Sequence, residues 1–379
     1  MKIYLDNAAT TAVAPGVRQA MEPFLGDMYG NPSSVHQAGR QAKAAVEGAR
    51  EQVAQVLHAS PLEIVFTSGG TEADNSALIG AALARQEFGK HIVTTSIEHH
   101  AVLNTCEFLE QLGFEVTYVD PELNGIVPLE AVEKALRPDT QVISVMMVNN
   151  ETGAIQPVEQ IGALARERGI VMHTDAVQAL GLLELDVEKL NVDLLSISGH
   201  KIHAPKGIGA LYVHHNLKWT PFLHGGNQER KRRGGTENLL GIVGMGEAVR
   251  LSQGERETKL SHIRELRTTM LQVFEQELDP TLYVINSPEQ SIPSILNVSF
   301  PGVMAERLLM NLDMQGIAAS SGSACTAGAL QPSHVLTAMG LSQDEVMSAI
   351  RFSFSGHNTV DEVREAAQKT ADVVKRLHR

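Results

Sequence analysis

The stretch Gln141–Gln178, QVISVMMVNNETGAIQPVEQIGALARERGIVMHTDAVQ, decides the fold of this chain. It begins with an apolar run of strand length, VISVMMV, and continues through a helical pattern, PVEQIGALARERG, that stops at a glycine, as helices commonly do. A second β-rich run, GIVMH, follows at once. A strand, a helix and a strand in this order predict two parallel strands of one sheet.

The same alternation of strand and helix patterns extends over most of the chain, without a repeat or a low-complexity tract. It predicts an α/β fold with a large domain built on a mainly parallel seven-stranded sheet. Helical patterns such as TEADNSALIGAALARQEFG separate the strands. The candidate strands are EIVFTSG, HIVTTSIEHH, EVTYVD, QVISVMMVNNETG, GIVMHTDAVQ, DLLSISGHK and IGALYVHH.

The pattern of strands and helices in the sequence changes after about Gly254. A charged helical stretch, ERETKLSHIRELRTTMLQVFEQEL, is followed by a short strand pattern, SILNVSF, and by another helix pattern, AERLLMNLDMQG. We therefore predict a large domain over residues 16–254 and a smaller α+β domain made of residues 1–15 and 255–379.

Composition and charge limit the partners of the protein. Its 44 acidic and 31 basic residues give a net charge of −13, which opposes binding to nucleic acid or to anionic membranes outside a local basic patch, ERKRRGG at 229–235. The two cysteines, Cys106 and Cys325, lack the spacing of a disulfide framework or a cysteine zinc site and fit a reducing compartment. The start, MKIYLDNAATT, has no apolar signal core, and the longest apolar runs have strand length, so we expect a mature cytoplasmic protein.

Polar residues gather where the candidate strands end. In open α/β sheets, ligands bind beyond the carboxyl ends of the strands. Any one of these residues could be an ordinary turn or cap residue, but agreement at five strand ends predicts a binding site. The residues are Thr71, His99, Asn150, Asp175 and Gln178, and His200 with Lys201.

The motif TSGGTE at 67–72 is typical of an anion cradle, because its glycines let the backbone approach a ligand at a helix N-terminus. It lacks the Gly-Lys-Ser/Thr ending of a nucleotide P-loop and the spacing of a dinucleotide fingerprint. A single phosphate suits it better, such as the phosphate of pyridoxal 5′-phosphate.

That cofactor needs an amine and a carboxylate. Lys201 directly follows a strand, whereas the competing Lys206 lies in a turn, APKGIG, so Lys201 is preferred for the Schiff base. Asp175 fits the partner of a pyridinium nitrogen, with a helix cap before AVQALGLLEL as the alternative.

His99 could stack on the cofactor ring and shuttle protons. The histidine pairs at 99 and 214, together with His200 and His203, raise the alternative of a metal site. Adjacent histidines on a strand point to opposite faces, so we predict no metal site.

Taken together, the motifs have a specific resemblance that covers essentially the whole chain in order. They resemble the cysteine desulfurases, pyridoxal-phosphate enzymes of the class V aminotransferase type. The resemblance implies a homodimer of fold type I that takes sulfur from L-cysteine, releases L-alanine and carries the sulfur as a persulfide on Cys325. The motifs are YLDNAATT, GNPSSVH, TSGGTEADN, IEHHAV, VNNETG, HTDAVQ, SGHKIHAPKGIG, RRGGTEN and SSGSACTAG.

The resemblance also implies a role for each matching residue. Lys201 is similar to the Schiff-base lysine, Asp175 to the partner of the pyridine nitrogen and His99 to the stacked proton shuttle. The remaining matches are Asn150 and Gln178 for the phenolic oxygen, Gly70, Thr71, Ser198 and His200 for the phosphate with Thr236 from the other subunit, and Arg351, assisted by Asn31, for the substrate carboxylate.

Cys325 lies among small residues, SSGSACTAG, which would let its thiol travel between the cofactor and a sulfur acceptor. No cationic residue lies within this loop, so an isolated thiol would keep a pKa of about 8.5 and be only a few per cent ionised at pH 7. Activation therefore has to come from the site that the thiol visits. The loop resembles that of the mobile-loop subgroup rather than the short, fixed loop that favours selenocysteine.

Alternatives stay open at this point. A class V aminotransferase or a selenocysteine lyase would share the fold, and a non-catalytic subunit could keep the fold only to present Cys325 to partners. The chain ends soon after VDEVREAAQKTADVVKRLHR, whereas relatives that dock an iron–sulfur scaffold carry a further tail. Both an iron–sulfur scaffold and a tRNA-thiolating enzyme are therefore kept as protein acceptors of the sulfur.

Overall fold

The stretch 141–178 folds as a strand, a helix and a strand in the computed structural model, which describes residues 3–254, 256–322, 325–326 and 329–378, with the backbone alone for 325–326 and 329–330. β5 (Thr140–Ser144) leads to α6 (Val158–Arg168), and β6 (Val171–Asp175) returns parallel to β5. Gly169 ends α6 with a φ of +67°, a conformation that glycine adopts without the steric cost of a side chain. The predicted unit is confirmed.

The central sheet contains all the predicted strands, in the order β2-β8-β7-β6-β5-β3-β4. Its pairings are parallel except that β8 runs antiparallel to both of its neighbours. The α/β fold with a mainly parallel seven-stranded sheet is thus confirmed. The remaining strands are β2 (Ile64–Thr67), β3 (His91–Thr95), β4 (Glu115–Val119), β7 (Leu194–Ser198) and β8 (Gly209–Val213).

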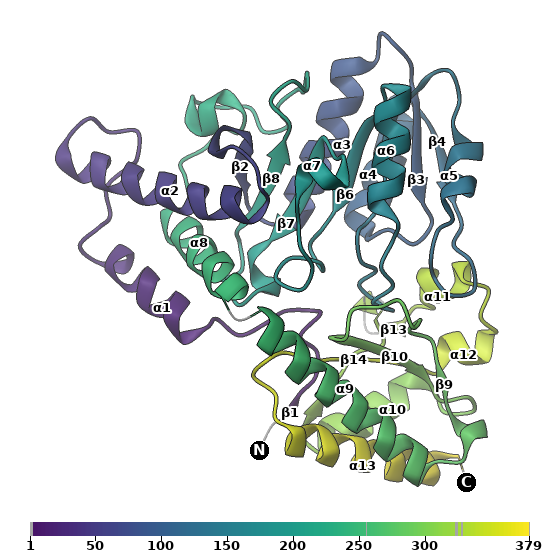
Figure 1. Cartoon of the computed structure of the whole chain (residues 1–379). Coiled ribbons are helices and arrows are strands. Elements are labelled where there is room, and N and C mark those ends of the chain that lie inside the picture. The colour runs from purple at the N-terminus through teal and green to yellow at the C-terminus, as the bar shows by residue number, and fades with distance from the viewer. Residues whose placement is uncertain (1–2, 255, 323–324, 327–328, 379) are drawn as a thin grey trace.

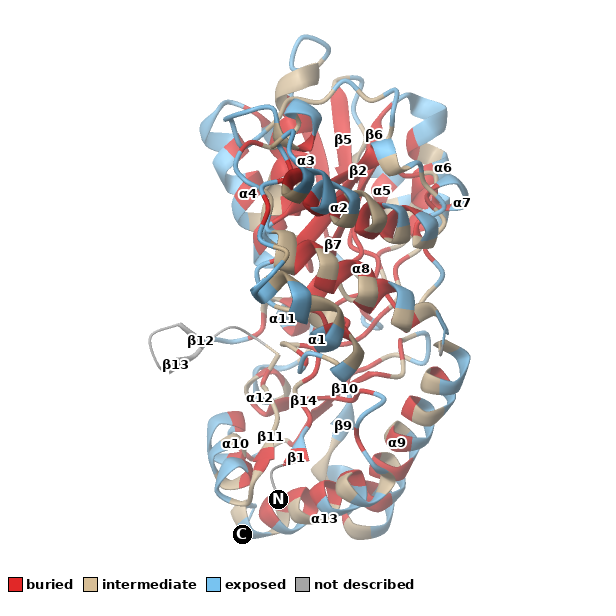
Figure 2. Ribbon diagram, turned by 90° about the vertical axis from the view of Figure 1, so that its left-hand side faces the viewer, coloured by how far each residue is buried: buried red, intermediate tan, exposed pale blue. Residues whose placement is uncertain are grey.

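Both faces of this sheet are covered, and Figure 2 shows its strands mostly in the colour of buried residues. Successive residues of a strand point to opposite faces, so Val142 and Ile143 of β5 enter different hydrophobic clusters. The helices of this part of the chain are α1 (Pro15–Met21), α2 (Gln37–Val56), α3 (Gly70–Arg85), α4 (His100–Gln111), α5 (Leu129–Ala135), α7 (Val187–Leu190) and α8 (Leu239–Gly254).

A separate hydrophobic cluster lies in the lower part of Figure 1, where both chain ends are found. Its apolar side chains include Leu5, Phe274 and Phe352, so the N-terminal segment packs with residues beyond position 255. The domain boundaries stay a prediction, which this cluster supports. Its elements are β1 (Ile3–Tyr4), α9 (Arg256–Glu277), β9 (Val284–Ile285), β10 (Ile295–Ser299), α10 (Ala305–Met314), β11 (Ile317–Ala318), α11 (His334–Ala338), α12 (Gln343–Met347), β14 (Ala349–Ser353) and α13 (Val360–Leu377).

One helix expected from the sequence does not form. The segment AVQALGLLEL, residues 176–185, consists of turns, and the next helix is the short α7, capped by Asp186. Gly181 has a φ of +77° in the middle of this segment, which is incompatible with a right-handed helix. The interpretation of Asp175 as the cap of a helix at this position is therefore wrong.

The basic stretch 229–235 is held in place by its first residue, the acidic Glu229. Glu229, Arg230 and Lys231 adopt positive φ angles of 45°, 57° and 66°, an unfavourable conformation for residues with a side chain. The buried Glu229 carboxylate accepts hydrogen bonds from both terminal nitrogens of Arg50, at 2.8 and 2.7 Å, and from the backbone N–H of Phe66, at 2.9 Å. These contacts hold the strained turn against the sheet.

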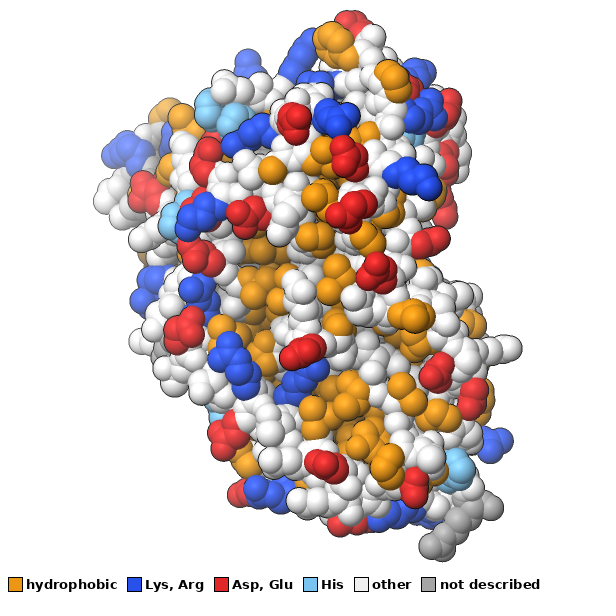
Figure 3. All heavy atoms as spheres, turned by 45° about the vertical axis from the view of Figure 1, so that its right-hand side comes forward, with side chains coloured by type: hydrophobic (Ala, Val, Ile, Leu, Met, Phe, Trp, Pro, Cys, Tyr) orange, Lys and Arg blue, Asp and Glu red, His pale blue; other side chains and the backbone are white. Residues whose placement is uncertain are grey.

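The surface of the protein carries charges of both signs. On the face shown in Figure 3, acidic and basic side chains are interspersed rather than gathered into one basic surface. No helix among the described residues is both long enough and apolar enough to cross a membrane.

We predict that Glu229→Gln lowers the free energy of unfolding by about 3–5 kcal/mol, because it removes the buried partner of the Arg50 guanidinium and leaves only the partly exposed Glu47 as its counter-charge. Urea denaturation followed by circular dichroism measures the change. Glu133→Ala is the matched control, since its ion pair with Arg168 is half exposed and should be worth less than about 1 kcal/mol. A Glu229→Gln variant as stable as this control would contradict the role of the ion pair.

Candidate active site

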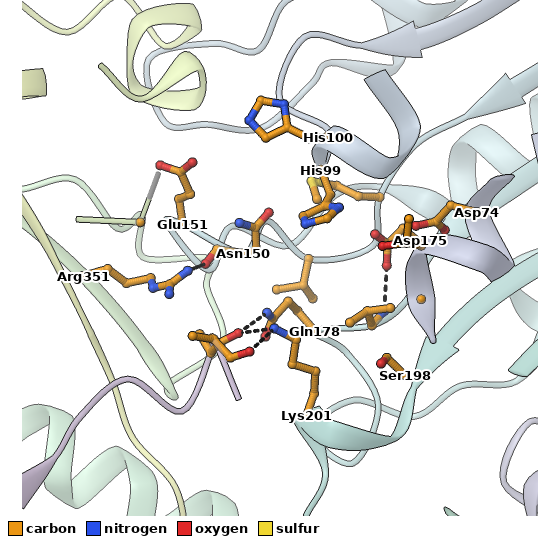
Figure 4. A pocket seen from close by; sticks show the side chains of 18 of the residues that line it. Asp74, His99, His100, Asn150, Glu151, Asp175, Gln178, Ser198, Lys201 and Arg351 are labelled. Carbon is orange, nitrogen blue, oxygen red and sulfur yellow. Dashed lines mark hydrogen bonds between the residues drawn. The ribbon is translucent and has the colours of Figure 1, made fainter. Parts of the chain in front are cut away.

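The predicted site residues meet in a cavity of about 390 Å³ at the carboxyl ends of β5, β6 and β7. Figure 4 shows their side chains converging on this space. The strand ends therefore form one site, as the sequence suggested. The predicted residues that line the cavity are Gly70, Thr71, His99, Asn150, Asp175, Gln178, Ser198, His200, Lys201 and Arg351.

Lys201 lies in the short turn of 3-10 helix Gly199–Lys201 that directly follows β7. Its Nζ donates hydrogen bonds to the carbonyl oxygens of Ala8 and Ala9, the latter at 2.9 Å. Burial and the positive charge of Arg351 lower the pKa of Lys201 to about 8, so part of the amine is neutral near physiological pH. Lys206 is exposed and does not line the cavity, which favours Lys201 as the reactive amine.

Asp175 ends β6, and its Oδ1 accepts a hydrogen bond from the backbone N–H of Val177 at 2.8 Å. Burial, together with the nearby carboxylate of Asp74, raises the pKa of Asp175 to about 7. A buried carboxylate in this position is stabilised by a cation placed next to it. The protonated nitrogen of a pyridine ring would meet that need.

Asp74 is a cavity residue that the sequence analysis did not single out. It lies on α3, is 1% exposed, and its Oδ1 has no hydrogen-bond partner among the described residues, with His173 Nε2 at 3.5 Å. Burial raises its pKa to about 7. The motif TSGGTEADN contains Asp74, one helical turn after Gly70. This spacing places both residues on one face of the helix and could have identified Asp74 as a cavity residue.

His99 caps α4, and its Nδ1 accepts a hydrogen bond from the backbone N–H of Ala101 at 3.1 Å. Nε2 therefore carries the proton of the neutral ring. The His99 side chain is exposed to the open cavity, but partial desolvation by the surrounding protein and the charge of Lys201 lower its pKa to about 4, so the ring is neutral at physiological pH.

The predicted geometry of the adjacent histidines is wrong. β3 ends at Thr95, and His99 and His100 stand at the start of α4 instead of on a strand. Successive helical residues are rotated by much less than the half-turn that separates strand residues, so both rings line the cavity.

Arg351 lies on β14, whose larger apolar side chains belong to the separate hydrophobic cluster near the chain ends, and it lines the cavity. Its terminal nitrogens donate to Asp6 Oδ1 at 3.0 Å and to the backbone oxygen of Asn150 at 2.8 Å. The guanidinium is therefore fixed between the two cores, and its buried Nε has no partner among the described residues. A planar guanidinium held in this way is suited to a carboxylate.

Three predicted residues are not placed in the cavity of the single chain. Asn31 and Thr236 are exposed and do not line it. Cys325 belongs to β12 (Cys325–Thr326), which pairs with β13 (Ala329–Leu330), and its side chain lies outside the described part of the structure. The roles of these three residues stay predictions.

The model of the aminotransferase class-V family matches residues 3–365. A Bacillus subtilis (strain 168) protein named IscS 1 is 51% identical over 99% of both chains, and the "Cysteine desulfurase IscS" of Methanosarcina thermophila is 46% identical over 99% of this chain and 92% of its own length. This chain belongs to the cysteine desulfurase family. A solved structure named "NIFS-LIKE PROTEIN" matches this family member with a TM-score of 0.93 at 38% identity, over 99% of this chain and all of the other.

Cysteine desulfurases use pyridoxal 5′-phosphate, and the cavity of this family member fits that cofactor. The N-terminus of α3 and the buried Ser198 Oγ, which has no hydrogen-bond partner among the described residues, form a place for a phosphate. A Cβ at Gly70 would lie 2.9 Å from Val177, so only glycine leaves the room found there. Asp175 would supply the counter-charge for a ring nitrogen, and Lys201 would supply the amine.

We predict that cofactor-free protein attaches pyridoxal 5′-phosphate covalently at a rate that increases with pH and levels off above the Lys201 pKa of about 8. Only the neutral amine attacks an aldehyde, so below that pKa the rate should fall about tenfold per pH unit. Stopped-flow absorbance between pH 6 and 9.5 measures it.

Lys206→Ala is the matched control for this pH profile and should leave it unchanged. Lys201→Ala should lose the attachment that borohydride can fix. Attachment that persists in Lys201→Ala and disappears in Lys206→Ala would transfer the role to Lys206.

Proposed function

We propose that this chain converts L-cysteine to L-alanine and holds the released sulfur as a persulfide on Cys325. One observation carries the proposal: a single cavity combines Lys201, with its lowered pKa, the buried Asp175 and the fixed Arg351, and it also contains Ser320 and Gly322, the residues that lead to Cys325. A solved relative called "SspA in complex with cysteine" supports the choice of substrate, with 41% identity and a TM-score of 0.83.

When bound, pyridoxal 5′-phosphate supplies an aldehyde that an amine can hold and a ring that withdraws electrons from the substrate. Gly70, Thr71, Ser198 and His200 would bind its phosphate, Asp175 its ring nitrogen, Asn150 and Gln178 its phenolic oxygen, and the ring of His99 would lie against it.

The residues around the substrate divide the work between binding and proton transfer. Arg351 binds the carboxylate of L-cysteine, a role for which its planar fork of donors is suited. The neutral fraction of Lys201 accepts the proton of the α-carbon, because an amine with a pKa of about 8 is both a good base and partly unprotonated near pH 7. His99 is neutral at this pH and has its Nδ1 occupied by the backbone N–H of Ala101, which leaves the proton on Nε2 for transfer in the cavity.

The sulfur leaves the substrate by attack of the Cys325 thiolate on the substrate sulfur. A sulfur–sulfur bond forms, the carbon–sulfur bond breaks, and a protein acceptor later takes the persulfide sulfur. Both an iron–sulfur scaffold and a tRNA-thiolating enzyme fit this delivery. The composition favours a cytoplasmic enzyme that does not itself bind nucleic acid. The residues around Cys325 favour a mobile-loop enzyme.

We further propose a homodimer in which Thr236 completes the phosphate site of the neighbouring chain. Thr236 is exposed and lies outside the cavity of its own chain. Large apolar side chains on the segment around Asn31 also face solvent in the single chain, notably Tyr29 at 82% and Val35 at 89% exposure, and a second chain would cover them.

We predict that Cys325→Ser stops the formation of alanine from L-cysteine but leaves cofactor binding intact. A serine hydroxyl is far less acidic than a thiol and cannot hold a persulfide. Mass spectrometry should find one added sulfur atom on Cys325 of the wild-type protein and none on the variant. Alanine produced at the wild-type rate by the variant would favour an aminotransferase-type activity instead.

Cys106 is the matched control for this experiment. It is buried on α4, and burial raises its pKa, so it should not react. Cys106→Ala should keep the persulfide on Cys325. A persulfide found on Cys106 would overturn the assignment.

Mixed dimers test the contribution of Thr236. Lys201→Ala inactivates a chain's own site, whereas Thr236→Glu should repel the phosphate in the neighbour's site. In a dimer of the two variants one site contains both changes and the other contains neither, so random mixing should restore about a quarter of the wild-type activity. No recovery after subunit exchange, or a fully active monomer, would refute the shared site.

A further inference from the structure

Three side chains with metal-binding groups meet at one corner of the central sheet. Glu63 directly precedes β2, and His214 and His215 follow the last residue of β8. Figure 1 shows β2 and β8 side by side, and they run antiparallel with Ile64 paired with Tyr212. The start of one strand therefore lies beside the end of the other, which brings Glu63 to the histidines although 152 positions separate it from His215.

This corner lies one strand length away from the cavity. Gly209, at the other end of β8, pairs with the cavity residue Ser198, whereas Val213 pairs with Leu194 at the start of β7. The four steps from Gly209 to Val213 span about 13 Å of strand. A ligand bound at this corner would therefore be separate from the cofactor and the substrate.

The two histidines do not have the geometry of neighbours on a strand. Adjacent strand residues point to opposite faces, and on that ground we predicted no metal site from the sequence. His214 and His215 come after β8 has ended, however, and their rings lie side by side, with centroids 4.3 Å apart and an angle of 37° between their planes. Both imidazoles are thus placed on the same side of the chain.

Glu63 supplies a carboxylate whose position is fixed. Its side chain is 7% exposed, its Oε2 accepts the backbone N–H of Ser60 at 2.9 Å, and its Oε1 accepts the backbone N–H of His215 at 2.9 Å. Burial would raise the pKa of Glu63, but the hydrogen bonds from Ser60 and His215 outweigh it and hold the pKa below its usual value. The carboxylate is therefore ionised at neutral pH, as a metal ligand has to be.

The spacing of the ligand atoms suits a small ion. Each of the three side chains has one ligand atom within 4.8 Å of those of the other two. His215 Nδ1 lies 2.7 Å from Glu63 Oε1, so a metal ion would take the place of the proton between them. A tetrahedral ion with bonds of about 2.1 Å needs its ligands roughly 3.4 Å apart, so shifts of less than about 1.5 Å would complete the site.

The two rings are free to make such shifts. The side chain of His215 is 63% exposed. The ring of His214 makes one hydrogen bond among the described residues, a long one of 3.3 Å from the backbone N–H of Asn216 to Nδ1. The preformed and rigid part of the site is therefore Glu63, and the histidines adjust to the ion.

The positive charge of Arg232 acts on Glu63 but does not occupy the site. The guanidinium of Arg232 donates to the backbone oxygen of Leu62 at 2.9 Å, and it makes no ion pair with Glu63 among the described residues. The Glu63 carboxylate therefore remains available to His215 and to an ion.

A second group of metal-binding side chains, His58, Glu184 and Asp186, is less suited to an ion. Lys189 Nζ donates to Glu184 at 3.1 Å and lies 3.4 Å from Asp186 Oδ2, so both carboxylates already have a cation. Asp186 also accepts the backbone N–H groups of Glu188 and Lys189. This group contains a single imidazole, and His58 is a matched control for the histidines of the first group.

We propose that Glu63, His214 and His215 bind one divalent transition-metal ion, for which zinc is the best match, with water in the remaining position. Two imidazoles and one carboxylate are ligands that zinc takes in tetrahedral sites, and three protein ligands leave one position open. The exposed side of His215 gives the ion access from solvent. The proposal is independent of the proposed function.

The test measures zinc binding to the holoenzyme by isothermal titration calorimetry, in a Cys325→Ser background so that this thiol cannot bind the ion. The parent should bind one zinc ion per chain more tightly than any other. His214→Gln and His215→Gln should each weaken this binding by about 100-fold or more, because each removes a direct ligand. His58→Gln should stay within about twofold of the parent.

Two further readouts report the geometry of the site and its effect on the fold. Cobalt(II) in place of zinc should give the intense visible absorption of a four-coordinate ion, and both histidine variants should lose it. Zinc at about 100 times its Kd should raise the midpoint of thermal unfolding of the parent by about 2–5 °C, because the ion ties the start of β2 to the end of β8. This rise should be absent from both variants.

The histidine variants decide the result, because Glu63→Gln would also disturb the capping of Ser60. Zinc bound with equal affinity by the parent and by both histidine variants would mean an adventitious ion only and would overturn the site. An equal loss of binding in His58→Gln, or the weak absorption of a six-coordinate cobalt ion in the parent, would overturn it as well. With Cys325 intact, His215→Gln should form alanine from L-cysteine at the wild-type rate, and a loss there would contradict the separation of this site from the cavity.

Discussion

The site depends on one constraint, which is the burial of the central sheet on both of its faces. With Val142 and Ile143 entering opposite hydrophobic clusters, polar side chains on the strands themselves would have to be buried between helices and sheet. The carboxyl ends of the strands are the place where polar groups can meet a ligand. Asp175 and Lys201 stand at such ends, and this is why they share one cavity.

Burial then sets the chemistry of these groups. Loss of hydration penalises charge, so it lowers the pKa of Lys201 and of His99 and raises that of Asp175. The result is a lysine that is partly neutral near pH 7 and a carboxylate that gains by binding a cation. The polar side chains of the cavity therefore suit a phosphorylated, protonated ring, and Arg351 of β14, which we propose binds the substrate, lines the same cavity.

The cavity has two halves with different tasks. One half, at the N-terminus of α3 and around Asp175, is suited to the cofactor. The other half is lined by Arg351, Ser320 and Gly322, the last two of which lead to Cys325 in the sequence. This division explains how a fold shared with aminotransferases can carry a reaction that also needs a thiol from its own chain.

The sequence by itself determined the α/β class, the strands of the sheet and the residues at the strand ends, because each of these follows from local periodicity and from short motifs. It was misleading where a local pattern competed with backbone geometry. The apolar run 176–185 looks helical, but Gly181 takes a positive φ, and His99 and His100 belong to the start of a helix instead of a strand.

Only the tertiary structure decided which distant residues complete the site. Arg351 is ion-paired with Asp6, 345 positions away, and His334 is hydrogen-bonded to Glu98 across 236 positions. No motif includes His334, and nothing in the sequence places it beside His100. Such contacts come from the packing of one core on another, which depends on the summed burial of many side chains and leaves no short-range pattern in the chain.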